Sequence, residues 1–394
     1  MNQQQLSEAR EKLNEHPDEE WKDSSWSGED QRQVLQKLEE ASLSTLFGVF
    51  GRYFKSIDWQ GLTIMVATAA AHCVPGQMLW NRIYGGSRSG KTELLRAIAR
   101  HPDSTEMEYI TPASIRGGLG KGQKVLKRIN DKLVITKDLA SMLTTKPELR
   151  TEVFGLLRSV KDGKITSDFG TEEGYLSQGV KFDWIIGTTP VFAQYKQMED
   201  LLGARYIDLN WRTGNREEMA AQAMENNPIL DTVIRPAVAE AVCKLIDRVK
   251  DKQRLYPAEL DDDTKKMIAD WADVTALSRS PVARDHQHRV RFHPEPEVGT
   301  DLAQGLQRTA KGLGLLDVAD SSSFIARLCG DCIPYDRREA IDKILKNGSV
   351  GFDEARQYTL EDLRLLGVCE KVGSRYYMKP ELEERIALLC SWWI

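Results

Sequence analysis

The chain has 394 residues, and this length exceeds what a single hydrophobic core usually organises, which excludes a one-core fold and predicts about two or three domains. The formal net charge is −5, but residues 1–40 hold eleven acids against five bases, so the rest of the chain is close to neutral, at +1. The composition therefore excludes a chain that is basic throughout, and any basic surface must be a local patch.

The cysteines and the hydrophobic segments predict a cytoplasmic protein. The six cysteines are scattered, and we expect reduced, buried thiols. Cys329 and Cys332 have a spacing that would suit zinc, but no second pair completes four ligands. The longest apolar stretch, Leu62 to Cys73, is too short for a membrane span, and the N-terminus does not resemble a signal peptide. We expect no membrane partner.

The N-terminal third predicts a tail followed by a strand, a glycine-rich loop and a helix. Residues 1–40 are polar and acidic, which favours a flexible or partner-docking tail. Apolar residues recur at helical spacing within residues 56–73. Residues 78–84 read as a buried strand, and residues 92–100 as an amphipathic helix. The glycine-rich loop therefore lies between a strand and a helix N-terminus.

That loop has the pattern G-x-x-x-x-G-K-T, which is typical of a phosphate-binding loop. Glycines let backbone N–H groups turn inward on a polyphosphate, the Lys91 ammonium neutralises phosphate oxygens, and the Thr92 hydroxyl holds Mg²⁺. The preceding strand and following helix disfavour the alternative of a chance match in a surface loop. The predicted ATP site comprises Gly85, Gly86, Ser87, Arg88, Ser89, Gly90, Lys91 and Thr92.

The middle of the chain alternates between predicted strands and helices. We expect a helix at 147–160, a hairpin that begins at Lys164 after the turn dipeptide Asp162-Gly163, and strands at 108–112, 132–136 and 182–187. This alternation predicts an α/β fold with a parallel sheet, helices on both faces, and ligands at the carboxyl ends of the strands.

The C-terminal part is expected to be mostly helical. Residues 217–274 are rich in helical pattern, and residues 281–300 form a loop rich in Pro, His and Arg. Helices are then expected at 336–345, 353–359 and 360–366, followed by a hairpin at 368–378. This succession resembles a winged helix. Its expected recognition helix contains acids, so protein docking and DNA binding are equally open for this end.

Several polar residues follow the predicted strands near the loop. Asp138 could hold the water shell of Mg²⁺ or polarise an attacking water, and the residue type leaves both roles open. Thr188 and Thr189 could orient that water, although an ordinary strand exit has the same residues. Glu93 follows Thr92 and is either a neighbour of the metal or a structural residue.

These features together resemble the AAA+ ATPase module, and most of all the MCM-like, hairpin-bearing helicases of bacteriophages and mobile elements. They are the Walker-type loop, the single acid Asp138, a hairpin before the strand that leads to Thr188, and the sequence Leu-Leu-x-x-Arg205-Tyr. The resemblance spans residues 60–330. It implies a ring, often hexameric, in which ATP and Mg²⁺ lie between subunits and the hairpin projects into a central channel.

The resemblance also implies individual roles. Thr92 and Asp138 would be the metal ligands, Thr188 or Thr189 would be sensor 1, and Arg205 would reach the γ-phosphate in a neighbouring subunit, with a surface salt bridge as the alternative. Arg279 or Arg284 would supply sensor 2. Lysines at the hairpin would contact phosphates of single-stranded nucleic acid, namely Lys161, Lys164 and Lys181.

The predicted domains are a tail at 1–40, an AAA+ core at 41–215, a helical lid with a connecting segment at 216–325, and a winged-helix-like domain at 326–394. We expect an ATP-hydrolysing motor or remodeller, such as a DNA helicase or replication ATPase of a phage or mobile element, with DNA and a replication protein as partners. The usual Asp-Glu pair and an N-terminal zinc-and-barrel domain are absent from the sequence. The first departure favours an ATP-switched initiator with slow hydrolysis as the alternative, and a small-molecule kinase is a weaker one.

Overall fold

The computed structural model describes residues 41–86, 89–109, 111–112, 123–139, 146–163, 165–168, 175–189 and 205–392. The predicted acidic tail lies outside these residues, as do Ser87, Arg88 and Lys164. The chain divides into two compact units. The first comprises Met1–Leu202, Asn210–Glu259 and Arg308–Ser321, and the second comprises Gly203–Leu209, Leu260–Gln307 and Ser322–Ile394.

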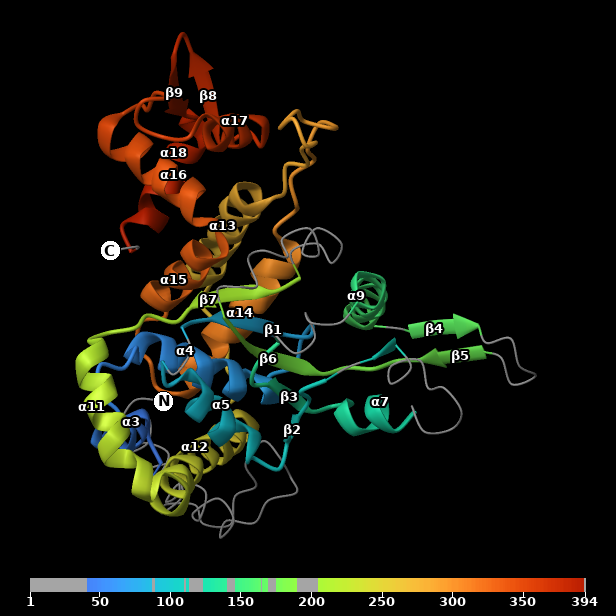
Figure 1. The fold of residues 1–394 in the computed structure, drawn as a ribbon, viewed down its shortest axis with the longest axis vertical. Coiled ribbons are helices and arrows are strands. Elements are labelled where there is room, and N and C mark those ends of the chain that lie inside the picture. The colour runs from blue at the N-terminus through green and yellow to red at the C-terminus, as the bar shows by residue number, and fades with distance from the viewer. Residues whose placement is uncertain are drawn as a thin grey trace. The chain divides into compact units, whose positions relative to one another are not determined.

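A five-stranded parallel sheet flanked by helices confirms the α/β prediction (Figure 1). The strand order is β2-β3-β6-β1-β7, so β6 separates β1 from β3. The register pairs Tyr84 with Thr188 and Thr136 with Ile186. The central strands β1, β3 and β6 are almost entirely buried because neither face meets water, although β1 contains the polar residues Asn81 and Arg82. The strands are β1 (Trp80–Tyr84), β2 (Ser104–Glu106), β3 (Leu133–Thr136), β6 (Asp183–Thr188) and β7 (Ile207–Asn210).

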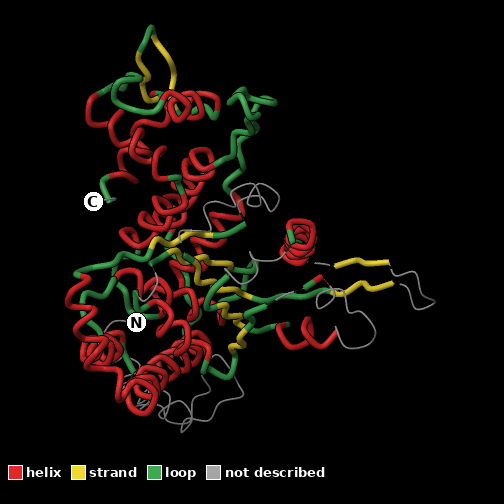
Figure 2. Tube along the Cα trace, viewed as in Figure 1, coloured by secondary structure: helices red, strands yellow, loops and turns green. Residues whose placement is uncertain are grey.

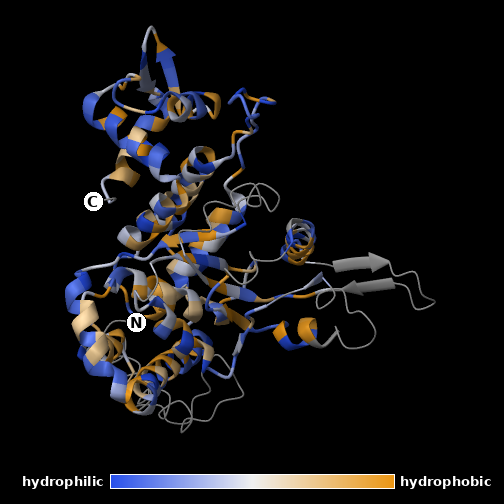
Figure 3. Ribbon diagram, in the orientation of Figure 1, coloured by the Kyte–Doolittle hydropathy of each residue, from blue (hydrophilic) through white to orange (hydrophobic). Residues whose placement is uncertain are grey.

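Helices of the first unit pack closely against the sheet and against each other. Asp58 caps α4 by accepting a hydrogen bond of 2.9 Å from the amide of Gly61, and nearly every residue of this helix is buried. Helix α12 packs against α5, α3 and α4, and Figure 3 shows both hydrophobic and hydrophilic residues along it. The bounds are α3 (Leu43–Tyr53), α4 (Trp59–Ala70), α5 (Lys91–Ala99), α11 (Arg216–Asn226) and α12 (Arg235–Leu255), with short helical turns η1 (Ala71–Cys73), η4 (Asn227–Ile229) and η5 (Leu230–Ile234).

The predicted hairpin before β6 is confirmed. Two antiparallel strands, β4 (Ile165–Asp168) and β5 (Tyr175–Gln178), follow helix α9 (Pro147–Lys161), and Figure 2 shows them as a strand pair. Gly163 has a φ of +91°, which lies in the left-handed region that favours glycine, and this turn ends α9. Helix α7 (Gln123–Ile129) precedes β3.

The second unit is mainly helical. Helix α13 packs against α15 and α18, and a bridge between Val350 and Tyr376 adds an extended residue beside the C-terminal hairpin. Helix α14 (Thr300–Leu315) spans the boundary between the units. The other elements are α13 (Asp262–Arg279), α15 (Ser322–Cys332), α16 (Tyr335–Asn347), α17 (Gln357–Leu365), β8 (Cys369–Val372), β9 (Arg375–Met378) and α18 (Pro380–Cys390).

Two local predictions were wrong. The strand expected at 108–112 lies at Ser104–Glu106 instead, where a short polar segment pairs with β3 at the edge of the sheet. The helix expected at 353–359 is a turn followed by α17, because Glu354 accepts a hydrogen bond of 3.0 Å from the amide of Gly351 and pairs with Arg375 at 2.8 Å. No helix in the described part of the chain is long and apolar enough to cross a membrane.

Candidate functional site

The glycine-rich loop joins β1 to α5 and needs glycine at two positions. Gly90 has a φ of +87°, which side-chain-bearing residues rarely adopt. A Cβ atom on Gly85 would lie 3.0 Å from the Cβ of Trp211, and the Trp211 indole donates a hydrogen bond of 2.8 Å to the carbonyl of Ser89. Gly85 and Ser89 of this loop therefore lie directly against Trp211, the residue that follows β7.

The ammonium of Lys91 lies inside this loop. It donates hydrogen bonds of 2.8 Å to the carbonyl of Gly85 and 3.1 Å to that of Gly86, and the side chain is buried. Burial lowers the pKa of Lys91, and the nearby Asp138 carboxylate partly opposes this by favouring the charged form. An amine whose charge is disfavoured by burial is stabilised by any anion that enters the loop.

The strand order brings the predicted acid and threonines to the same edge. The amide of Gly85 donates to the carbonyl of Thr188 at 3.3 Å, and the amide of Leu139 donates to the carbonyl of Gly187 at 3.0 Å. Backbone bonds thus connect the loop, the end of β6 and the segment that contains Asp138. Thr188 is buried, with its hydroxyl 3.4 Å from the carbonyl of Thr189, and Asp138 is exposed.

The three predicted arginines lie in the second unit, each with partners there. Arg205 pairs with Asp301 at 2.6 Å. Arg279 is buried, pairs with Glu297 at 3.1 Å, and donates to the carbonyl of Tyr206. The third, Arg284, pairs with Asp362 at 2.5 Å. For Arg205, the surface salt bridge that sequence reasoning left as the alternative is present.

The hairpin lysines differ in their surroundings. The Lys161 ammonium contacts the carbonyl of Met78 and lies 5.3 Å from the centroid of the Trp80 ring, so it points toward the start of β1. This contact argues against a phosphate contact by Lys161. Lys181 is exposed, and Lys164 lies outside the described residues. The predicted nucleic-acid contact at the hairpin therefore rests on Lys181 and Lys164.

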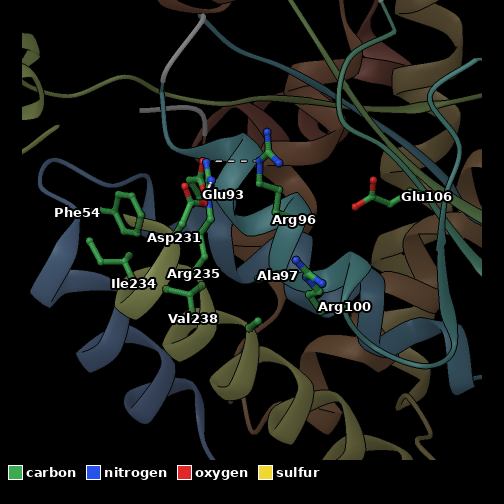
Figure 4. Close-up of a pocket in the computed structure, with 11 residues that line it drawn as sticks. Phe54, Glu93, Arg96, Ala97, Arg100, Glu106, Asp231, Ile234, Arg235 and Val238 are labelled. Carbon is green, nitrogen blue, oxygen red and sulfur yellow. Dashed lines mark hydrogen bonds and ion pairs between the residues drawn. The ribbon is translucent and has the colours of Figure 1, made fainter. Parts of the chain in front are cut away.

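A pocket of about 180 Å³ beside the loop was not predicted (Figure 4). On its wall, Arg235 of α12 binds both carboxylate oxygens of Glu93, at 2.8 and 2.9 Å, and also contacts Asp231. These hydrogen bonds raise the pKa of Arg235. Glu93 therefore ties α5 to α12, in keeping with its structural alternative. The remaining lining residues are Phe54, Arg96, Ala97, Arg100, Glu106, Ile234, Val238 and Ala239.

The cysteines do not form a metal centre. All six are described and free, and burial raises the pKa of Cys329 to about 12 and that of Cys332 further. Within the described ranges, no group of three or more His, Cys, Asp or Glu residues could hold a metal ion. The zinc spacing at Cys329 and Cys332 therefore falls on a buried helix, α15.

The fold and the loop define an α/β protein whose parallel sheet and strand–loop–helix unit are compatible with a P-loop fold. No known protein-family model matches the sequence, and no curated protein is detectably similar to it. The case for a function therefore comes from the geometry of the loop and its neighbours.

Proposed function

We propose that this protein is an AAA+ ATPase that binds ATP with Mg²⁺ and acts on nucleic acid in the cytoplasm, as a DNA helicase or replication ATPase of a phage or mobile element. The observation that supports it best is the buried Lys91 ammonium held inside a glycine loop at a helix N-terminus. A helix N-terminus favours a polyphosphate, and the ammonium would exchange two carbonyl contacts for phosphate oxygens.

The sheet order supports the assignment of the other groups. Because β6 lies between β1 and β3, Thr188 stands between the loop and Asp138. In this proposal Thr92 and Asp138 hold Mg²⁺, which would neutralise phosphate charge, and the hydroxyls of Thr188 and Thr189 orient the attacking water. Asp138 could also accept the proton of that water.

Oligomerisation is part of the proposal, as a ring that is often hexameric. The Arg205–Asp301 pair has side-chain exposures of 24% and 41%, and such surface pairs are worth less than about 1 kcal/mol. In this proposal Arg205 exchanges Asp301 for the γ-phosphate of a neighbouring subunit. The ion pairs of Arg279 and Arg284 are less exposed than that of Arg205. Either arginine would therefore lose more stabilising free energy on leaving its partner to act as sensor 2. The proposal also includes a helical lid at residues 216–325. It assigns residues 326–394 to a winged helix that binds DNA or a replication protein.

A second candidate is an ATP-switched initiator platform that hydrolyses ATP slowly and does not unwind DNA. The observation that favours it is that the sequence neighbours of Asp138 are Lys137 and Leu139, so no second acid adjoins it in the sequence, and Lys137 is bound to Glu106 and Glu108, each at 2.7 Å. A strand-displacement assay separates the two candidates, because the platform would bind DNA in the presence of ATP and leave the duplex intact.

Calorimetry with ATP and Mg²⁺ tests the nucleotide site. We expect wild type to bind and Lys91→Ala to lose at least tenfold in affinity, because a charge-assisted contact to phosphate disappears. Lys132→Ala is the matched control, since this lysine also donates to a carbonyl, that of Pro102 at 3.1 Å, but lies at the start of β3. Equal binding by wild type and Lys91→Ala would overturn the proposal.

Subunit mixing tests the ring. Neither Lys91→Ala nor Arg205→Ala alone should hydrolyse ATP. Lys91→Ala should fail because it binds ATP poorly, and Arg205→Ala should bind ATP but lack the arginine that reaches the γ-phosphate of the neighbouring subunit. A mixture should recover activity, since Lys91→Ala subunits supply Arg205 to the intact loops of their neighbours. No recovery at any ratio, with both variants folded by circular dichroism, would remove Arg205 from the site and leave the nucleotide proposal intact.

A further inference from the structure

The loop between α13 and α14 contains a small hairpin, here called the arginine loop, residues 284–292 (Figures 1 and 2). Arg284 and Val290 form an antiparallel bridge, and the amide of Asp285 donates to the carbonyl of Arg289 at 2.9 Å. The Asp285 carboxylate accepts hydrogen bonds from the amides of Gln287 and Arg289, at 2.8 and 2.9 Å. Hydrogen bonds within the turn therefore order it, and the Asp285 carboxylate takes part in two of them.

The arginine loop is fixed to one side of α17, at Tyr358 and Asp362. Arg284 binds Asp362 of that helix and lies 5.2 Å from the centroid of the Tyr358 ring. The His288 ring stacks on Tyr358 with centroids 4.9 Å apart and an interplanar angle of 25°. Loop and helix therefore present one continuous surface within the second unit.

The exposed side chains of this surface include two arginines and two aromatic rings. Arg289 and Arg291 are exposed, and within the described part of the chain neither guanidinium has a hydrogen-bond or ion-pair partner. Phe292 is 65% exposed and Tyr358 is 50% exposed. Proteins bind single-stranded nucleic acid with two components. Cationic side chains contact the phosphates, and exposed aromatic rings stack on the bases.

The acids of α17 do not oppose such a partner. Asp362 lies between Arg284 and Arg337, the latter 3.0 Å away. Glu361 pairs with Arg364 at 2.8 Å and accepts a hydrogen bond from the Tyr376 hydroxyl. Burial alone would raise the pKa of Glu361, but these bonds lower it, so the carboxylate stays ionised and neutralised by its partners. The sequence suggested that acids on this helix would disfavour nucleic acid. Because both acids are paired with basic side chains, that objection no longer applies.

We propose that the arginine loop and Tyr358 form a binding surface for single-stranded nucleic acid, with Arg289 and Arg291 on phosphates and Phe292 stacked on a base. This surface is separate from the hairpin lysines and needs no ATP. It binds without sequence preference, because rings and phosphates are common to all bases.

Fluorescence anisotropy of the full chain with a labelled oligothymidylate of about 20 nucleotides, without ATP, tests the surface. The double variant R289A/R291A should bind about tenfold more weakly at moderate salt, and the slope of log K against log salt should fall by about 1.4, or about 0.7 for each lost phosphate contact. The matched control is K265A/K266A, which removes the same charge from exposed positions of α13 in the same unit. Equal losses in both double variants would overturn the proposal.

Phe292→Ala separates stacking from charge. It should weaken single-strand binding about tenfold, leave the salt slope unchanged, and leave duplex binding unaffected. If wild type binds polyglutamate as tightly as oligothymidylate and Phe292→Ala changes neither, the surface fits an acidic protein and the proposal fails. ATP binding by R289A/R291A should equal that of wild type, so this failure is distinguishable from failure of the nucleotide site.

Discussion

Gly187 controls how closely two strands of the site approach each other. A Cβ atom at this position would lie 2.5 Å from the backbone carbonyl oxygen of Lys137 and 2.8 Å from a methyl carbon of Leu95. The first contact involves backbone, which cannot rotate away, so the segment that contains Asp138 would have to shift. The position of the acid thus depends on the absence of a single side chain in the neighbouring strand.

Gly187→Ala should therefore destabilise the protein by about 1–3 kcal/mol and lower the proposed ATPase activity even where the variant is fully folded. Urea unfolding and steady-state hydrolysis measure the two effects. Gly155→Ala in α9 is the control, because nothing lies within 4 Å of its added Cβ. That change should be neutral or stabilising by about 0.5–1 kcal/mol, since alanine favours helix. Equal stability of wild type and Gly187→Ala would contradict the close approach.

At the scale of elements, α12 is joined to the first turn of α5 by the Arg235–Glu93 ion pair. Arg235 is 31% exposed and Glu93 is 18% exposed, so water screens this pair only in part. The bidentate geometry fixes both side chains, which lowers the entropy cost of each hydrogen bond. The pair therefore helps to place α5, the helix that begins at the glycine-rich loop.

Arg235→Met should lower the free energy of unfolding by about 1–2 kcal/mol, because a partly buried carboxylate loses its hydrogen bonds to a charged group. A double-mutant cycle with Glu93→Gln, measured by urea unfolding, should give a favourable coupling energy of about 1 kcal/mol. Lys244→Met on the same helix is the control, since the side chains of Lys244 and its partner Glu240 are 67% and 66% exposed and this variant should be about as stable as wild type. A coupling energy of zero would show that the pair contributes nothing.

At the scale of the molecule, a buried ion pair joins distant segments of the first unit. Asp183 at the start of β6 binds Arg308 of α14 at 2.7 and 2.9 Å and accepts hydrogen bonds from the amide of Leu79 and the ring of His72. Arg308 also donates to the carbonyl of Ala71 at 2.6 Å. Helix, strand and connecting turn thus meet at one carboxylate, at the opposite end of β6 from the candidate site.

Asp183→Asn should destabilise the protein by about 3–5 kcal/mol, because it leaves the buried Arg308 charge uncompensated. Asp247→Asn is the control: Asp247 is 64% exposed and pairs with His101. Unfolding monitored by circular dichroism gives both values. A loss at Asp183 no larger than that at Asp247 would show that Arg308 finds other partners.

The same carboxylate predicts a pH dependence. Burial raises the pKa of Asp183, but hydrogen bonds from His72 and Arg308 outweigh it and hold the pKa below its ordinary value of 3.8. Because the folded-state pKa is lower than the unfolded-state pKa, the ionised Asp183 carboxylate contributes its full stabilisation above the unfolded-state pKa of 3.8. This stabilisation is lost as the pH falls through the folded-state pKa. The difference in stability between wild type and Asp183→Asn should therefore shrink below pH 3.8. A constant difference across this range would contradict the assignment.

The sequence by itself determined the elements whose signals are local. The strand–loop–helix at 80–99 and the turn before the hairpin follow from glycines that need unusual backbone angles and from apolar periodicity over a few residues. The polar edge strand β2 was misplaced, and β7 was not predicted, because pairing with a neighbouring strand rather than residue type defines both. The domain boundaries, the lid and the winged helix stay predictions.

Only the tertiary structure decided which charges face each other. Arg235 lies 142 residues from Glu93, Arg308 lies 125 residues from Asp183, and Arg284 lies 78 residues from Asp362. No spacing rule links such positions, because long-range packing sets them. The sequence therefore revealed a loop with the pattern of a phosphate-binding loop. The fold decided that Thr188 and Asp138 lie at the same edge as this loop and that, among the residues that the structure describes, Arg289 and Arg291 have no ion-pair partner.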